Sequence, residues 1–365
     1  MTPRTLIPGV ALAGLVFGLG YWMGSRSSGG SSPAHSTKGG AGSVSSVSGA
    51  RLNPVPGASE RAAGARQNTP LARLLSEGEP PKPLTSEEVE AYVRLNHANA
   101  QSLLAAFETD KDMNWLRQAA GKFPDDPRVM FAVVNFGDDT IPGRRQEWLD
   151  KLARAAPENA LVDYLSASEQ LKQKNPEGAI RALLAAQGKT SFDDYTMHTI
   201  QSAEEMHARA GRSPAEAKAM AGTQTRLPHL QELRNLGREM AKLYETRRRA
   251  GDASTANEIA AAGLNMGRHM SVGAGNRYLL NELVGIATEK VFLDALDPSV
   301  EHPFLDRPLA ELQRELQKQR DNIKTVAAAV DLEKMSDADV IAYFDRMKLY
   351  GEYETLKWFY ARIEP

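Results

Sequence analysis

The sequence feature that most constrains the fold is a segment that the chain contains twice. Residues 115–133 read WLRQAAGKFPDDPRVMFAV, and residues 148–166 read WLDKLARAAPENALVDYLS. In each copy a helix-forming stretch ends at a proline turn, and a second stretch follows. A period of about 34 residues with this content is typical of stacked helical hairpins. The aligned identities are Trp115 with Trp148, Leu116 with Leu149, Ala120 with Ala153, Pro124 with Pro157 and Val129 with Val162.

Composition favours a body built from helices alone. After residue 84 the chain is rich in Ala, Leu, Glu, Arg, Lys and Gln, and no alternating run rich in Val, Ile and Thr predicts a strand. The chain has no cysteine, which excludes disulfides, thiolate zinc sites and a cysteine nucleophile. We therefore predict an all-α fold for residues 84–365.

Several helix starts are marked by local capping signals. Thr85 or Ser86 can cap a first helix with Glu88 completing a capping box, and Ser213 precedes Pro214 and Glu216 in the same pattern. We also predict a helix from about Pro308 to Glu333 and a last helical hairpin that bends at Gly351.

The segment after the second copy carries a family resemblance. Its first helix places Tyr164 and Ser168 at helical spacing; Asn175 and Pro176 then open a second helix. Small, large and small residues follow in that helix, namely Ala179, Leu183 and Ala186. This pattern resembles a tetratricopeptide repeat.

The resemblance implies an α-solenoid of antiparallel hairpins over residues 84–365. Its repeats are clearest over 110–270, and a helical cap follows over 276–365. The repeat that contains Lys174 is degenerate. Lys174 stands where the family has glycine, and the turn between its two helices is one residue short. A further hairpin is expected from Gly237 to Met266, turning at Gly251 and Asp252.

The N-terminal part of the chain, 1–83, differs from this body. A short tail, 1–5, precedes an uncharged run, 6–24, which is long enough to span a bilayer. We predict an uncleaved signal anchor there, the alternatives being a cleaved signal peptide or another buried segment. Residues 25–83, rich in Gly, Ser, Ala and Pro, are expected to be a disordered linker.

The anchor sets the expected location of the protein. By analogy with short-tailed bacterial anchors, we expect the body on the extracytoplasmic side of the membrane, or secreted or periplasmic if residues 6–24 are cleaved. Gly14 and Gly18 have the spacing that allows two membrane helices to approach, so a homodimer is an alternative to a simple anchor.

Charge divides unevenly along the chain. Residues 1–70 hold six basic residues and one acidic residue, which leaves 38 basic and 45 acidic residues in 71–365. The body is therefore net −7. Because nucleic-acid binding needs an excess of Lys and Arg, we expect no nucleic-acid partner.

A candidate partner-binding surface lies on the helix that starts near Pro228. Leu233, Leu236, Met240 and Leu243 define its apolar side, and a basic stripe runs along the other side. The tetratricopeptide resemblance would place this stripe in a concave groove, where it would hold an acidic or carboxylate-terminated peptide. The alternative is a solvated helix face. The candidate residues are Arg238, Lys242, Glu245, Arg248 and Arg249.

Few residues point to catalysis. Glu204 and His207 have a spacing found in di-iron helices, but no second Glu-x-x-His exists in the chain. We expect no metal, no cofactor and no enzyme activity, and we read Trp115 and Trp148 as equivalent core residues. The predicted function is a membrane-anchored, non-catalytic scaffold for a protein or peptide. One alternative is an enzyme or enzyme-accessory domain whose site is not visible in the sequence. The other is a structural envelope component.

Overall fold

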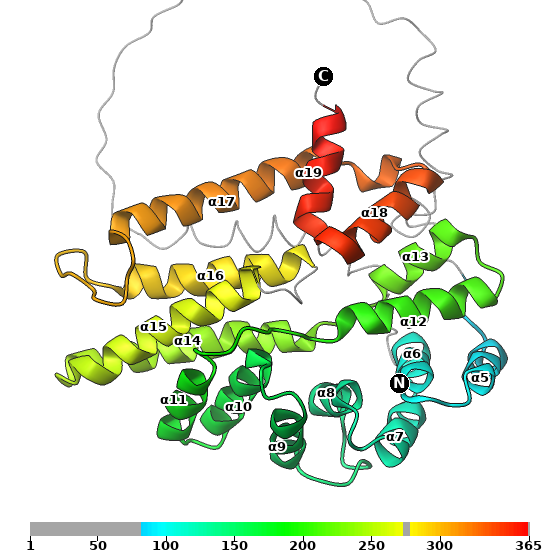
Figure 1. Ribbon diagram of the computed structural model, residues 1–365, viewed down its shortest axis with the longest axis horizontal. Coiled ribbons are helices and arrows are strands. Elements are labelled where there is room, and N and C mark those ends of the chain that lie inside the picture. Colours follow the sequence, from blue (N-terminus) through cyan, green and yellow to red (C-terminus); the bar gives the residue numbers. More distant parts are fainter. Residues whose placement is uncertain (1–81, 273–277, 364–365) are drawn as a thin grey trace, which may run out of the picture.

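The computed structural model describes residues 82–272 and 278–363, and in these residues it is all α, with no strand (Figure 1). The prediction of an all-α body is confirmed. The helices are α5 (Ser86–Leu95), α6 (Ala100–Asp110), α7 (Met113–Lys122), α8 (Pro127–Phe136), α9 (Arg145–Ala155), α10 (Ala160–Lys172), α11 (Pro176–Ala185), α12 (Thr196–Arg209), α13 (Pro214–Thr223), α14 (Pro228–Arg249), α15 (Ala253–Val272), α16 (Leu279–Ala295), α17 (Leu309–Ala329), α18 (Asp337–Tyr350) and α19 (Glu352–Ile363).

The two copies of the repeated segment adopt the same local structure. The helices α7 and α8 form one copy, and α9 and α10 form the other. At the end of the first helix, Phe123 has φ −132° and ψ 55°, and Ala156, its equivalent, has φ −134° and ψ 65°. Asp126 and Asn159 are also equivalent, and each caps its second helix by accepting a backbone N–H two residues later. The repeat in the sequence therefore corresponds to a repeat in the local structure.

The helices α5 to α11 pack in sequence order, each against the next. From α12 onward the order changes, because α12 packs back against α5 and α6, α14 packs against α10, and α15 packs against α11. In Figure 1 the helices α5–α11 form the lower tier and α12, α14 and α15 cross above them. Helices far apart in the sequence are therefore in contact, which a series of repeats that touch only their neighbours does not have.

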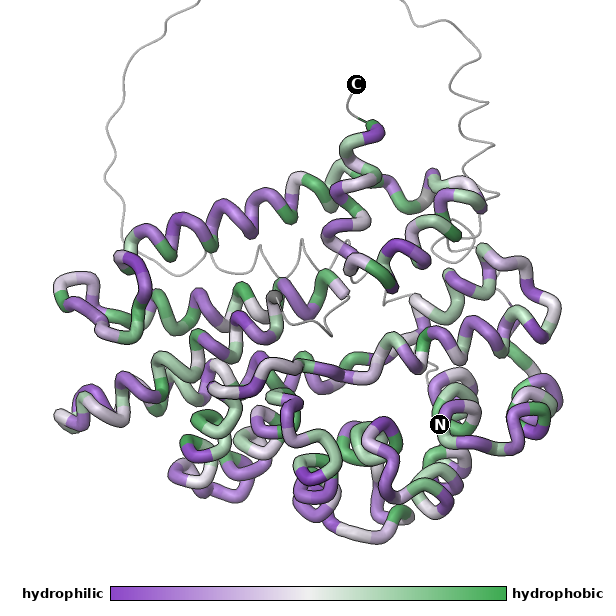
Figure 2. Tube along the Cα trace, viewed as in Figure 1, coloured by the Kyte–Doolittle hydropathy of each residue, from purple (hydrophilic) through white to green (hydrophobic). Residues whose placement is uncertain are grey.

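Above the lower tier, α15 and α16 form a close pair of helices. The central helix α16 packs against α14, α15 and α17, and it buries residues on several sides, as its apolar sequence predicts. Gly285 of α16 lies against the backbone of Gly267 and Ser271 in α15, with no room for a side chain between them. Figure 2 shows hydrophilic residues predominating along α17, which covers α16.

The C-terminal hairpin completes the body. The helix α18 packs against α13, and α19 packs against α18 and α17. Gly351 separates the two helices with φ +86°, a left-handed value that favours glycine. Its position confirms the bend expected from the sequence.

The expectations for residues 1–81 lie outside the described residues. They include the anchor at 6–24, most of the linker at 25–83 and the Gly14/Gly18 spacing. None of the helices that the structure describes is both long and apolar enough to cross a membrane.

Candidate functional site

The five candidate residues all lie on one side of α14. On the other side Leu233, Leu236 and Met240 are buried, as predicted, and Leu243 is half-buried. Pro228 at the first helical position fixes the start of the helix. Burial of the apolar side leaves the polar side of α14 facing solvent.

Exposure is highest toward the C-terminal half of α14. The side chain of Lys242 is 71% exposed and that of Arg249 is 77% exposed. Arg248 is also exposed, whereas Arg238 and Glu245 are half-buried. The structure therefore presents the basic stripe as an open helix face.

Acidic neighbours accompany the stripe. Lys242 Nζ lies 2.6 Å from a carboxylate oxygen of Glu239. Glu245 accepts from Arg248 at 3.1 Å and lies 3.6 Å from Arg249. Exposed pairs of this kind contribute about 0 to 1 kcal/mol each, so a partner's carboxylate can replace them at low cost. Residues 238–249 hold five basic and two acidic residues, but Arg247 pairs with Glu177 and Asp252. The excess therefore rests on four cations, namely Arg238, Lys242, Arg248 and Arg249, against Glu239 and Glu245.

An ion network that the sequence did not suggest attaches α14 to the lower tier. Arg145 donates to Glu169 of α10 and to Glu232 of α14, each at 2.8 Å, and Lys172 donates to Glu232 at 2.9 Å. Burial opposes ionisation of Glu232, but the charges of Arg145 and Lys172 hold its pKa below the ordinary value. The network fixes the orientation of α14 and is structural.

The most enzyme-like arrangement in the described residues is a buried acid–imidazole pair. Asp194 accepts from His229 and from Asn281, each at 3.2 Å. Burial opposes ionisation of Asp194, but the hydrogen bond and charge of His229 hold its pKa below the ordinary value. Asp194 and His229 are 4% and 1% exposed, and the pocket that Asp194 borders holds only about 40 Å³. The pair joins the segment before α12 to α14 and α16.

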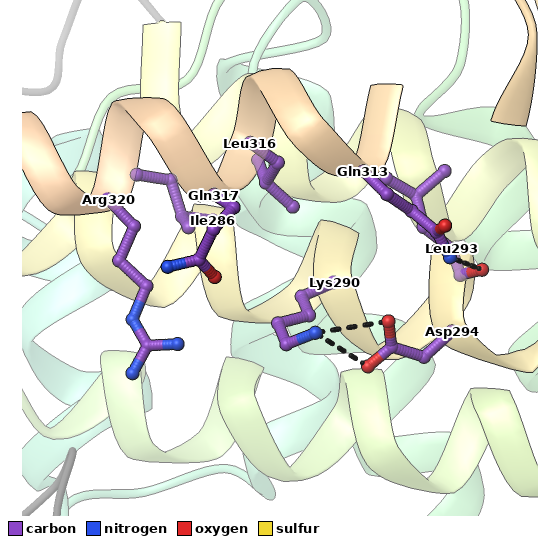
Figure 3. A pocket seen from close by; sticks show the side chains of 8 residues that line it. All are labelled: Ile286, Lys290, Leu293, Asp294, Gln313, Leu316, Gln317 and Arg320. Carbon is purple, nitrogen blue, oxygen red and sulfur yellow. Dashed lines mark hydrogen bonds and ion pairs between the residues drawn. The ribbon is translucent and has the colours of Figure 1, made fainter. Parts of the chain in front are cut away.

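A small pocket in the upper helices has no room for a ligand. It lies between α16 and α17 and holds about 20 Å³, room for one water molecule. Figure 3 shows Lys290 beside Asp294 at its edge, with Lys290 Nζ 2.9 and 3.1 Å from the two carboxylate oxygens. The pair is an i, i+4 contact within α16 and is already satisfied.

Two larger clefts are open and carry both signs of charge. One, of about 250 Å³ between α15, α16 and α17, contains Arg268, Arg307 and Glu289, and burial raises the pKa of Glu289 to about 7. The other, about 710 Å³, lies beside the loop between α8 and α9, where Asp139 and Arg144 are exposed. In the first cleft the hydroxyl of Ser271 donates to Glu289 at 3.2 Å, so a hydroxyl and a carboxylate meet there. The described residues that line the second cleft include no Ser, Thr, His or Lys.

The Glu204-x-x-His207 spacing does not form a shared site. Glu204 accepts from Lys218 at 2.6 Å and from Lys348 at 2.7 Å, which joins α12 to α13 and α18. His207 is fully buried, and neither ring nitrogen forms a hydrogen bond with Glu204. Within residues 82–272 and 278–363, no group of three or more His, Asp or Glu side chains is placed to hold a metal ion.

His207 gives the protein a pH-dependent stability that can be measured. Burial, together with the charge of Arg212, lowers its pKa from 6.5 to about 4. Between these values the unfolded chain binds a proton that the folded chain does not, so the free energy of unfolding falls as the pH drops from 6.5 to 4. The loss attributable to His207 is on the order of 3 kcal/mol.

The test compares the wild type with His207→Gln by urea unfolding at several pH values. Gln does not titrate, so we expect the variant to lose less stability than the wild type over this window. The difference in slope is independent of any constant destabilisation that the substitution causes. Parallel curves for the two proteins would contradict the prediction.

No protein-family model matches the chain, no curated protein matches it, and no solved structure matches it. A proposal for the function therefore rests on this chain's own residues. Among them, the basic stripe of α14 combines exposure with an excess of one charge.

Proposed function

We propose that the protein is a non-catalytic scaffold that residues 6–24 hold at a membrane and whose helical body binds a protein or peptide partner. In this proposal the hairpins α10–α11 and α14–α15 are degenerate tetratricopeptide-like units. The equivalent turns of α7–α8 and α9–α10 support it. The turn between α14 and α15 also falls at Gly251 and Asp252, where the resemblance places it.

The observation that carries the proposal is the uncovered polar face of α14. Lys242, Arg248 and Arg249 are exposed there on a body of net −7. A locally positive face attracts an acidic segment, whereas the net-negative remainder of the body repels it. The difference directs such a segment to this face. The partner class that fits is a peptide with acidic side chains or a terminal carboxylate, which guanidinium groups bind by paired hydrogen bonds.

The geometry changes how such a partner binds. The apolar side of α14 is covered by α10, α15 and α16, and α14 belongs to the tier that crosses over α5–α11. We therefore propose binding along an exposed helix face, where the tetratricopeptide resemblance implied a concave groove. Residues Arg238 to Arg249 span about three turns, enough for a short extended segment.

Reversing two charges on this face tests the proposal. We expect Arg238→Glu combined with Lys242→Glu to reduce partner recovery at least tenfold, because each lost charge-assisted contact contributes about 1.5 kcal/mol or more. The measurement is affinity capture from solubilised native membranes. The melting temperature should change by less than about 3 °C, because exposed ion pairs add little stability.

A matched control is available on α17. Arg314→Glu combined with Lys318→Glu makes the same charge change on two exposed residues of another helix. We expect this variant to recover the partner at the wild-type level. Equal recovery by both double variants and the wild type would refute the proposed site, and equal loss by both would show an effect of net charge alone.

The location of the protein is part of the same proposal. The body is expected on the extracytoplasmic side, and dimerisation through Gly14 and Gly18 stays an alternative for the anchor. Both statements concern residues outside the described part of the chain.

A further inference from the structure

The C-terminal hairpin carries a stack of aromatic and arginine side chains at its surface. The guanidinium of Arg346 lies over the ring of Tyr350 at 4.9 Å and over Trp358 at 4.4 Å. Arg362 also lies over Trp358, at 4.4 Å. We call Tyr350, Arg346, Trp358 and Arg362 the aromatic–arginine ladder.

The two helices that carry the ladder also hold exposed apolar side chains. Leu349 is 66% exposed, and Tyr350 and Ile363 are each 56% exposed. In the part of the chain that the structure describes, only five large hydrophobic side chains are this exposed, and three of them lie on α18 and α19. Such a concentration marks an interaction surface, whereas isolated exposed apolar residues are ordinary.

The members of the ladder differ in exposure, since Tyr350 and Arg362 are exposed whereas Arg346 and Trp358 are half-buried. The side of α19 next to Trp358 buries Thr355, Leu356 and Phe359, and α19 packs against α17 and α18. At its start the buried carboxylate of Glu352 accepts from the hydroxyl of Tyr343 at 2.5 Å and from the backbone N–H of Leu279 at 2.8 Å. These bonds fix the hairpin, so the surface is preorganised.

The chemistry of the ladder fits an anionic lipid surface. Tyrosine and tryptophan favour the level of the lipid headgroups, where their apolar rings and polar atoms are both satisfied. A guanidinium stacked on a ring keeps an edge for hydrogen bonds to phosphate. Near the ladder Lys357 pairs with Glu354 at 2.8 Å, which leaves the guanidinium groups of Arg346 and Arg362 as the ladder's positive charge on a body that is net negative.

We infer that the aromatic–arginine ladder docks onto the anionic surface of the membrane that holds the protein. This inference rests on the proposed anchoring by residues 6–24, which keeps the ladder near the bilayer. Docking would orient the body and hold the face of α14 in a fixed direction. A second copy of the chain is a poor occupant, because two ladders repel each other.

The absence of native cysteine makes a direct test simple. A single cysteine at Ala361, which is exposed beside the ladder, carries a spin label in the full-length chain. The protein is reconstituted with vesicles of phosphatidylcholine alone, or with a quarter of phosphatidylglycerol. The contact of the label with lipid is measured by two collision rates. One is the rate with oxygen, which partitions into lipid, and the other is the rate with a nickel chelate, which stays in water.

We expect the label at position 361 to be protected from nickel in the anionic vesicles and exposed in the neutral ones. A control label at Ala91, exposed on α5 beside Glu87 and Glu90, should stay in water in both. Replacing Arg346 and Arg362 by glutamine should lower the ratio of docked to free ladder about fivefold for each arginine.

The outcomes separate the inference from the anchor. Flotation of the labelled chain with vesicles while the label at 361 stays in water would overturn docking and leave the anchor intact. That result would point to an acidic protein as the occupant. Failure to float with either lipid mixture would overturn both the anchor and the docking. Equal protection in neutral and anionic vesicles would overturn the role of the arginines.

Discussion

Replacing Gly285 by alanine is expected to lower the free energy of unfolding by about 3 kcal/mol. A Cβ at this position would lie 2.5 Å from the carbonyl oxygen of Gly267 and 2.7 Å from the amide nitrogen of Ser271. Both are backbone atoms of α15 and cannot rotate away, so α15 and α16 must separate. Because α16 also packs against α14 and α17, the separation disturbs the packing of three helices. Urea unfolding measures the loss.

A matched glycine in a helix provides the control. Gly121 lies in α7, and a Cβ there meets no atom within 4 Å. Alanine is the better helix former, so Gly121→Ala should raise stability by about 0.5 to 1 kcal/mol. The two substitutions are expected to change the free energy of unfolding in opposite directions. The comparison therefore tests whether α15 and α16 lie as close together as the structure shows. A stability for Gly285→Ala at or above that of the wild type would show that the helices are farther apart.

Trp148→Ala is expected to cost about 3 to 5 kcal/mol. The ring is 5% exposed and packs in the core of the lower tier, and its indole N–H donates to the carbonyl of Pro142 at 3.1 Å. Truncation would leave a cavity beside the loop between α8 and α9 and would remove one of that loop's contacts. Thermal and urea unfolding both measure this cost.

Trp115→Ala should cost much less, about 1 to 2 kcal/mol, although the sequence predicts that the two tryptophans are equivalent. Trp115 is only half-buried, and its indole N–H donates to the exposed side chain of Asp110 at 2.8 Å. A half-exposed ring leaves solvent where a buried ring leaves a void. Equal costs at the two positions would show that the repeat places both rings in the core.

The sequence by itself determined the helices and their ends. The capping boxes at Thr85 with Glu88 and at Ser213 with Glu216 are both present, and Asn175 caps the helix that opens with Pro176. These interactions join residues within about one turn of each other, so a single stretch of chain contains all the groups involved. The structural period of the repeated segment also follows from local interactions, since the turns that repeat are made within each copy.

Only the tertiary structure decided how the tiers meet. The buried bond from Asn281 to Asp194 joins residues 87 apart, and Lys348 reaches Glu204 across 144 residues. The aromatic–arginine ladder likewise depends on how α19 folds back on α18. A helical pattern states which side of a helix is apolar but not which helix covers it, because many apolar sides can pack together at similar cost. The return of α12 onto α5 and α6, which places α14 above the lower tier with its basic side outward, was therefore fixed by long-range packing.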